Sequence, residues 1–148
     1  MTNSLFFLDS NVFMYCFGTD HPLKVPCERV INSIGDGTIV AVINTEVLQE
    51  ILHRFFLIKR RDLAYQLYDC AIGLCQAVLP VSLSDTNRAK EILLKNRNIE
   101  VRDAIHAACM LNNNIKEVIT ADRHFDQVKR IKRIDPLKFS SSSQQREL

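Results

Sequence analysis

The chain has 148 residues and a mass of 17.0 kDa, which is the size of a single domain with a substantial core. Its hydrophobic fraction of 47% is that of an ordinary globular protein, and its net charge of +2 does not by itself indicate a nucleic-acid-binding protein. No segment has the pattern of a signal peptide, and no apolar run is long enough to span a membrane. We therefore expect a cytoplasmic domain that has no membrane association.

The five cysteines support the same compartment. None forms a C-x-x-C pair, and four of them lie in apolar surroundings. We expect buried, reduced thiols rather than zinc ligands or disulfides. The residues are Cys16, Cys27, Cys70, Cys75 and Cys109.

Strands and helices are predicted to alternate along the chain. The strands are short apolar or β-branched runs, at residues 5–9, 38–43, 78–81, 117–121 and 131–135. The helices are predicted at residues 11–17, from the region of Pro22 and Pro26 to Ile34, and at 45–58, 61–77, 85–95 and 101–112. This order predicts an α/β fold with a parallel sheet and right-handed crossovers.

Local signals mark several of the predicted element ends. The glycines of 35–37 end one helix, as a glycine C-cap does. Asn44 and Ser84 are expected to cap the helices that follow them. Pro80 indicates that the third strand lies at an edge of the sheet. Residues 1–139 are predicted as one domain, and the serine- and glutamine-rich tail 140–148 as disordered.

Two predicted strands end in an aspartate. Asp9 follows residues 5–8 and Asp122 follows 118–121, and ligands of parallel sheets bind beyond the carboxyl ends of the strands. A strand-terminal aspartate is also a common helix cap, and for Asp9 alone the two roles are equally weighted. Asn11 can hold a carboxylate through its amide, and Thr120 can donate to one through its hydroxyl.

Further carboxylates lie in the helical patterns. Glu50 is favoured over Glu46 as a ligand, because apolar residues bracket it on the face turned toward the sheet. Asp103 opens the last long helix, where its charge also favours the positive helix end. His106 lies on the same face and is predicted as a satisfied buried histidine, with orientation of Asp103 or contact with a phosphate as the alternatives. Asp126 is a further ligand candidate, with a solvated helix charge as the equal alternative.

A cluster of carboxylates repels itself unless a hard cation holds it, and oxygen ligands suit Mg²⁺ or Mn²⁺. Such sites commonly cut phosphodiesters, which leads us to expect metal-assisted hydrolysis. Basic residues near the rim are expected to contact the backbone of the substrate. They form two clusters, namely Arg54, Lys59, Arg60 and Arg61, and Lys129, Arg130, Lys132 and Arg133.

Four stretches together resemble the acidic motifs of a PIN domain. They are residues 8–13 (LDSNVF), 45–51 (TEVLQEI), 101–108 (VRDAIHAA) and 119–126 (ITADRHFD), and in order they cover nearly the whole chain. The resemblance implies a three-layer α/β/α sandwich, a nuclease that uses Mg²⁺ or Mn²⁺, and frequent homodimers. Asp9, Glu50, Asp103 and Asp122 match the family's acidic quartet, and Asp126 matches a fifth, less uniform position.

A single-domain chain of this size is similar to VapC-type toxin ribonucleases, which implies an RNA substrate and an antitoxin partner. The predicted helices 45–58 and 61–77 carry more apolar residues than packing against one face of the sheet requires. We therefore expect an exposed apolar patch there that forms a homodimer or binds an antitoxin. One alternative is a non-catalytic PIN-like scaffold that binds RNA or protein. Another is a phosphohydrolase that uses Asp9 as a nucleophile, but no second aspartate stands two residues later.

Overall fold

The computed structural model describes residues 5–139, so the predicted tail 140–148 lies outside the described residues. Within this range the strands form one parallel sheet in the order β3-β2-β1-β4-β5. Their bounds are β1 (Leu5–Leu8), β2 (Val40–Asn44), β3 (Ala77–Leu79), β4 (Glu117–Ile119) and β5 (Lys132–Ile134). β1 therefore lies at the centre, and the predicted parallel sheet is confirmed.

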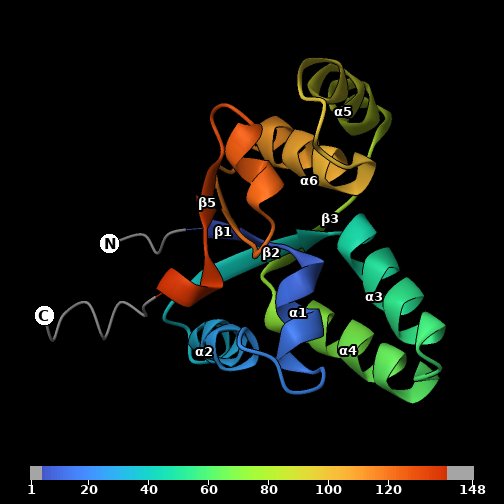
Figure 1. Cartoon of the computed structure of the whole chain (residues 1–148), viewed down its shortest axis with the longest axis vertical. Helices are drawn as coiled ribbons and strands as arrows, with labels where there is room; N and C mark the ends of the chain where they lie inside the picture. Colours follow the sequence, from blue (N-terminus) through green and yellow to red (C-terminus); the bar gives the residue numbers. More distant parts are fainter. Residues whose placement is uncertain (1–4, 140–148) are drawn as a thin grey trace, which may run out of the picture.

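Helices cover both faces of this sheet. They are α1 (Ser10–Cys16), α2 (Lys24–Gly35), α3 (Thr45–Leu57), α4 (Arg61–Leu74), α5 (Leu83–Lys95) and α6 (Val101–Asn112), with 3₁₀ turns η1 (Arg123–Gln127) and η2 (Pro136–Lys138). Figure 1 shows α5 and α6 on one side of the sheet and α1, α2 and α4 on the other. The predicted three-layer sandwich is thus confirmed. In the described part of the chain, no helix has both the length and the apolar character needed to cross a membrane.

Pairing between β1 and β4 joins two distant parts of the chain. Leu8 is in register with Ile119, and the backbone N–H of Asp9 donates to the Ile119 carbonyl at 3.2 Å. The two chains leave the sheet next to each other at their carboxyl ends. Asp9 and Thr120 therefore come together although 111 positions separate them.

Two predicted helix boundaries were wrong. α5 begins at Leu83 because Ser82, not Ser84, is its cap: the Ser82 hydroxyl accepts from the Asp85 N–H, and the Asp85 carboxylate accepts from the Ser82 N–H at 2.9 Å. α4 ends at Leu74 rather than at residue 77, because the Gln76 N–H donates to the Ala41 carbonyl of β2 and starts the edge strand β3. The predicted edge position of this strand is confirmed.

The cap at Asn44 is confirmed, since its side-chain oxygen accepts from the Val47 N–H at 3.0 Å. Four of the five cysteines are buried, but Cys70 is exposed on α4. The prediction of a buried thiol was wrong for Cys70, because its position on α4 faces away from the core.

Candidate functional site

A cavity of about 830 Å³ lies beyond the carboxyl ends of β1 and β4. The four acidic residues of the predicted quartet line it together with Glu100, and the four come from separate parts of the chain. Asp9 follows β1, Glu50 belongs to α3, Asp103 lies in the first turn of α6, and Asp122 follows β4. The structure therefore brings together the four acidic residues that the sequence singles out.

Asp9 is buried, and hydrogen bonds surround its carboxylate. One oxygen accepts from the Ser10 N–H at 2.7 Å, and the other accepts from the Thr120 hydroxyl at 2.8 Å and the Asn11 amide at 3.3 Å. The predicted contacts of Thr120 and Asn11 are thus confirmed. Burial raises the pKa of Asp9 above its usual value, although the nearby His106 and the hydrogen bonds oppose this. The residue caps α1 and lines the cavity at the same time.

Glu50 is held from two sides. Its Oε2 accepts from the Ser10 hydroxyl at 3.0 Å, and its Oε1 lies 2.5 Å from His106 Nε2. The other ring nitrogen, Nδ1, lies 3.1 Å from the Asn44 amide nitrogen, so Nδ1 accepts and Nε2 donates to Glu50. Burial lowers the pKa of His106, but the hydrogen bond to Glu50 and the charge of Asp9 outweigh it and raise the pKa overall.

His106 is thus a satisfied buried histidine, as the sequence predicted, with an exposure of 0%. It contacts Glu50 on α3 rather than Asp103, whose orientation was one of the alternatives for this histidine. Both of its ring nitrogens have partners from α3 or its cap. The side chain therefore links α6 to the helix that carries Glu50.

Asp103 and Asp122 form the other half of the site. Burial raises the pKa of Asp103 to about 10, and the adjacent Asp122 and the charge of Asp9 act in the same direction. Burial also raises the pKa of Asp122, but the contact with Asp103 and the His124 N–H, which donates at 2.9 Å, outweigh it and lower the pKa overall. In the metal-free protein the two adjacent carboxyls therefore titrate as a pair, with the pKa of Asp103 raised and that of Asp122 lowered.

Among residues 5–139, potential ligand atoms fall into two groups of three. In each group the atoms lie within 4.8 Å of one another: Asp9, Glu50 and His106 form one, and Asp103, Asp122 and His124 form the other. His124 was not predicted from the sequence as a site residue. Its only signal there is its position two residues after Asp122, inside the last acidic stretch.

Two predicted candidates lie elsewhere. Asp126 forms an ion pair with Arg133 at 2.9 Å, its side chain is 55% exposed, and it is not among the residues that line the cavity. Glu46 also lies outside the lining; burial, followed by the charge of Glu50, raises its pKa. The geometry thus favours the alternative of a solvated helix charge for Asp126 over a ligand role.

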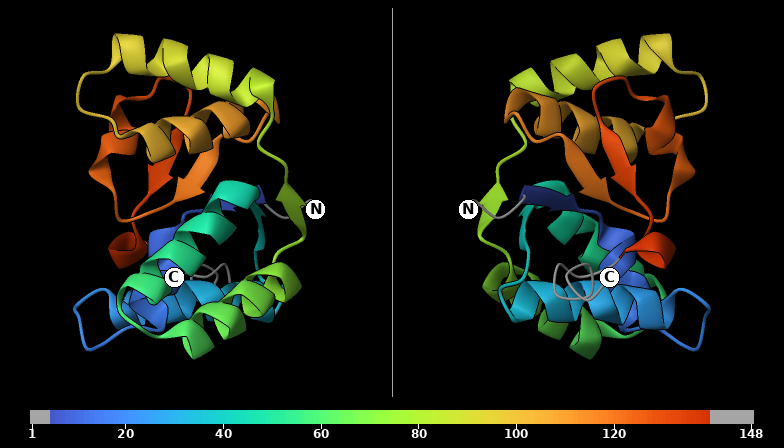
Figure 2. Two further views of the ribbon diagram at one scale, coloured as in Figure 1. Left: turned by 90° about the vertical axis from the view of Figure 1, so that its right-hand side faces the viewer. Right: turned by 90° about the vertical axis from the view of Figure 1, so that its left-hand side faces the viewer.

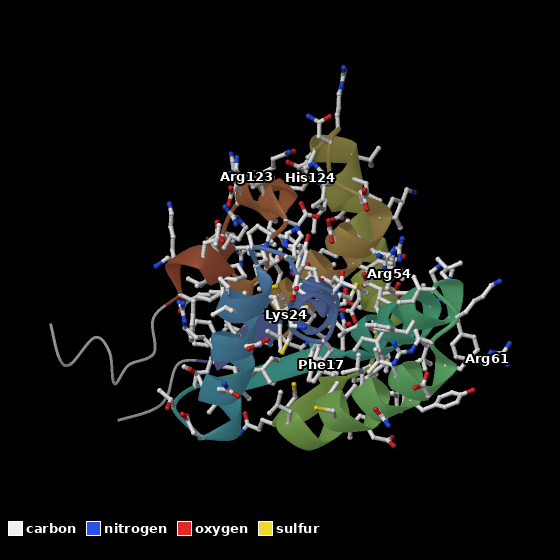
Figure 3. The ribbon with its side chains drawn as sticks, turned by 60° about the horizontal axis from the view of Figure 1, so that its bottom comes forward. Phe17, Lys24, Arg54, Arg61, Arg123 and His124 are labelled. Carbon is white, nitrogen blue, oxygen red and sulfur yellow. The ribbon has the colours of Figure 1, made fainter. Side chains whose placement is uncertain are left out.

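Basic side chains border part of the cavity. Arg54 of α3, from the first predicted basic cluster, is among the lining residues, and so is Arg102 of α6, which the sequence did not place in a cluster. Other members of the first cluster have different contacts: Arg60 pairs with Asp62, and Arg61 lies 4.8 Å from the centre of the Phe56 ring. Figure 3 shows Arg61 at the outer edge of the molecule and Arg54 nearer its middle.

The fold and the acidic cavity define a known class of protein. The profile of the PIN domain matches residues 6–131, which is most of the chain, so the chain belongs to the PIN domain family. Ribonuclease VapC13 of Mycobacterium tuberculosis is 39% identical over 127 residues, which cover 86% of this chain and 97% of that protein. The resemblance inferred from the four acidic stretches is confirmed.

Solved structures show the same fold at low sequence identity. FitAcB from Neisseria gonorrhoeae has a TM-score of 0.71 at 16% identity, with 91% of this chain and 99% of the other covered. VapBC2 from Rickettsia felis, solved with a DNA fragment from its promoter, has a TM-score of 0.68 at 13% identity, with 88% and 98% covered. These likenesses establish the architecture rather than the chemistry.

Proposed function

We propose that this chain is a metal-dependent endoribonuclease that hydrolyses RNA phosphodiester bonds as the toxin of a toxin–antitoxin pair. The observation that carries the proposal is the meeting of Asp9, Glu50, Asp103 and Asp122 in one cavity. Buried carboxylates without a cation are costly, so their assembly indicates a cation-dependent reaction. The name of the 39% identical relative, a ribonuclease, supports RNA as the substrate.

The donor set fits Mg²⁺ or Mn²⁺. All four residues offer carboxylate oxygens, which are the ligands that both cations prefer. Asp103 is 6% exposed, and its Oδ2 is buried without a hydrogen-bond partner. A native protein rarely leaves such an atom unpaired, and a cation held between Asp103 and Asp122 would satisfy it.

Each residue then has a separate task. A bound cation supplies the positive charge that polarises the phosphate and lowers the pKa of a water molecule. Asp9, Asp103 and Asp122 hold that cation, while Glu50 orients the attacking water or completes a second cation site. Ser10 and His106 hold Glu50 in place, so it needs no rearrangement when substrate binds. Arg54 and Arg102 at the rim neutralise backbone phosphates without reading the sequence.

An apolar surface on α3 and α4 is the proposed site of assembly. Phe56, Leu57, Ile58, Tyr65 and Ile72 are each at least 39% exposed, and α3 and α4 face the viewer in the left view of Figure 2. Phe55 and Leu67 were expected from the sequence to belong to the same exposed apolar patch, but both are buried in the core. The remaining exposed patch favours a homodimer, an antitoxin segment, or both. The similarity of the fold to a toxin–antitoxin complex from Klebsiella pneumoniae, with a TM-score of 0.64, supports the antitoxin partner.

Cleavage of mixed-sequence RNA tests the proposed reaction. The wild-type chain should cut RNA with Mg²⁺ or Mn²⁺ and should not cut it in EDTA. Asp122→Asn should abolish cleavage, whereas Asp126→Asn, a matched change four residues away outside the cavity, should retain it. Metal-independent RNA binding with no cleavage in any metal would favour the scaffold alternative.

A further inference from the structure

Two atoms of the described chain share an unusual property. Within residues 5–139, the buried side-chain nitrogen or oxygen atoms that lack a hydrogen-bond partner are Oδ2 of Asp103 and Nδ1 of His124. The residues that carry them, Asp103 and His124, belong to the same group of three potential ligands, whose third member is Asp122. Buried polar atoms in folded proteins are nearly always paired, so two unpaired atoms in one place call for a common partner.

The imidazole of His124 is fixed close to the carboxylate of Asp122. Nδ1 lies 3.1 Å from Asp122 Oδ1, yet the two atoms form no hydrogen bond. That oxygen already accepts from the His124 backbone N–H at 2.9 Å, because Asp122 caps η1. The side chain as a whole is 43% exposed, but its Nδ1 atom is shielded from solvent. The ring therefore places a buried nitrogen beside Asp122, although much of the side chain is exposed to solvent.

The spacing suits two ligands of one cation. Neighbouring ligands of an octahedral cation with bonds of about 2.1 Å stand about 3.0 Å apart. The separation of His124 Nδ1 and Asp122 Oδ1 has this size, and the nearby Asp103 contributes the unpaired oxygen. An ordinary ion pair between a protonated His124 and Asp122 accounts less well for the geometry, because it would place a hydrogen bond where none is formed.

We propose that His124 is a nitrogen ligand of the cation that Asp103 and Asp122 hold with Asp9, so that one nitrogen joins the carboxylate oxygens around it. The inference rests on the proposed metal-dependent function and adds a ligand to it. Imidazole nitrogen raises affinity for transition metals more than for Mg²⁺. The site should therefore prefer Mn²⁺ to Mg²⁺ by more than an all-carboxylate site would. Figure 3 shows His124 beside Arg123 at the start of η1.

Pulsed electron paramagnetic resonance of the full chain loaded with Mn²⁺ alone tests this ligand. We expect a nitrogen hyperfine coupling typical of directly bound imidazole in the wild type, and its loss in His124→Gln. His53→Gln provides the matched control, because His53 also lines the cavity but is exposed and, in the described structure, forms no hydrogen bond or ion pair with the four carboxylates. His106→Gln tests whether the nitrogen coupling arises instead from His106, which belongs to the other ligand group.

Calorimetric titration supplies the second readout. His124→Gln should weaken Mn²⁺ binding by about tenfold or more and Mg²⁺ binding by less. A coupling that persists in His124→Gln, or Mn²⁺ bound by the wild type with no nitrogen coupling, would overturn the proposal and leave the proposed function intact. If the wild type binds no Mn²⁺ and cuts no RNA, the proposed function itself fails. Circular dichroism of each variant establishes that it is folded, and His124→Asn replaces His124→Gln if the latter does not fold.

Discussion

Asp103→Asn is the substitution whose effect on stability can be derived most directly from the site. Asp103 is buried, and its pKa is raised to about 10 by burial, by Asp122 and by the charge of Asp9. In the unfolded chain the same carboxyl ionises near pH 4. The folded, metal-free protein therefore binds one proton at pH 7 that the unfolded chain releases.

The sign of the pH effect follows from that difference. Because the folded state binds more protons, the free energy of unfolding is highest below about pH 4 and falls as the pH rises toward the folded-state pKa. Each pH unit costs about 1.4 kcal/mol, so retention of the proton at pH 7 costs at most about 4 kcal/mol. This limit holds for any folded-state pKa above 7. Asparagine has no such cost, but its amide brings unpaired polar atoms worth about 1 to 3 kcal/mol.

We therefore expect metal-free Asp103→Asn to be more stable than the wild type at pH 7 by about 1 to 3 kcal/mol. Urea unfolding in EDTA at pH 5, 7 and 9 measures this, and the gap between the two proteins should widen with pH. Added Mn²⁺ should stabilise the wild type and not the variant, which should also have lost RNA cleavage. Asp126→Asn, in an exposed ion pair, is the matched control. A gap that stays constant with pH, or a variant less stable than the wild type at pH 9, would refute the assigned protonation.

Three further predictions concern other parts of the molecule. Arg54→Ala and Arg102→Ala, each made in a cleavage-deficient variant, should weaken RNA binding measured by fluorescence anisotropy. Each should also reduce the slope of log K against log salt concentration by roughly 0.7, because one phosphate contact is lost. An unchanged slope would remove the residue from the interface. His106→Ala should lower the free energy of unfolding, measured with urea, by about 3 kcal/mol or more, because it leaves Glu50 without its buried partner. A smaller loss would show that the link between α6 and α3 is weak. Leu57→Asp should convert a dimer to a monomer in light scattering, and a wild type that is itself monomeric at high micromolar concentration would contradict the proposed interface.

The positions of Asp9 and Asp122 were predictable because they depend on local patterns. Each follows a short apolar run, and in parallel sheets the carboxyl ends of strands gather at one edge. Glu50 was predictable for a related reason, since apolar residues at helical spacing indicate which face of its helix turns inward. The four acidic stretches then led to the family, which the profile match confirms.

The contacts of His106 and His124 could not be predicted from the sequence, because they depend on how separate helices and strands pack together. His106 meets Glu50 across 56 positions, and its choice of partner depends on the packing of α6 against α3. His124 faces Asp122 only because the chain turns into a 3₁₀ helix there, and a sequence pattern does not distinguish this turn from an α-helix. Ser82 could have been identified as the cap of α5, because Asp85 follows it at capping-box spacing whereas Asn87 stands three residues after Ser84.

Pairing of β1 with β4 has a consequence during protein synthesis. Asp9 emerges among the first residues, but Thr120 and Asp122, which complete its surroundings, are among the last described ones. A ribosome that adds about 5 to 20 residues per second needs roughly 6 to 20 seconds to make the intervening chain. Until then β1 lacks one of its two neighbours, and the cavity lacks a wall. A nascent chain of the proposed ribonuclease therefore cannot attack the RNA around it while it is being translated, and its activity begins only after the final strands dock.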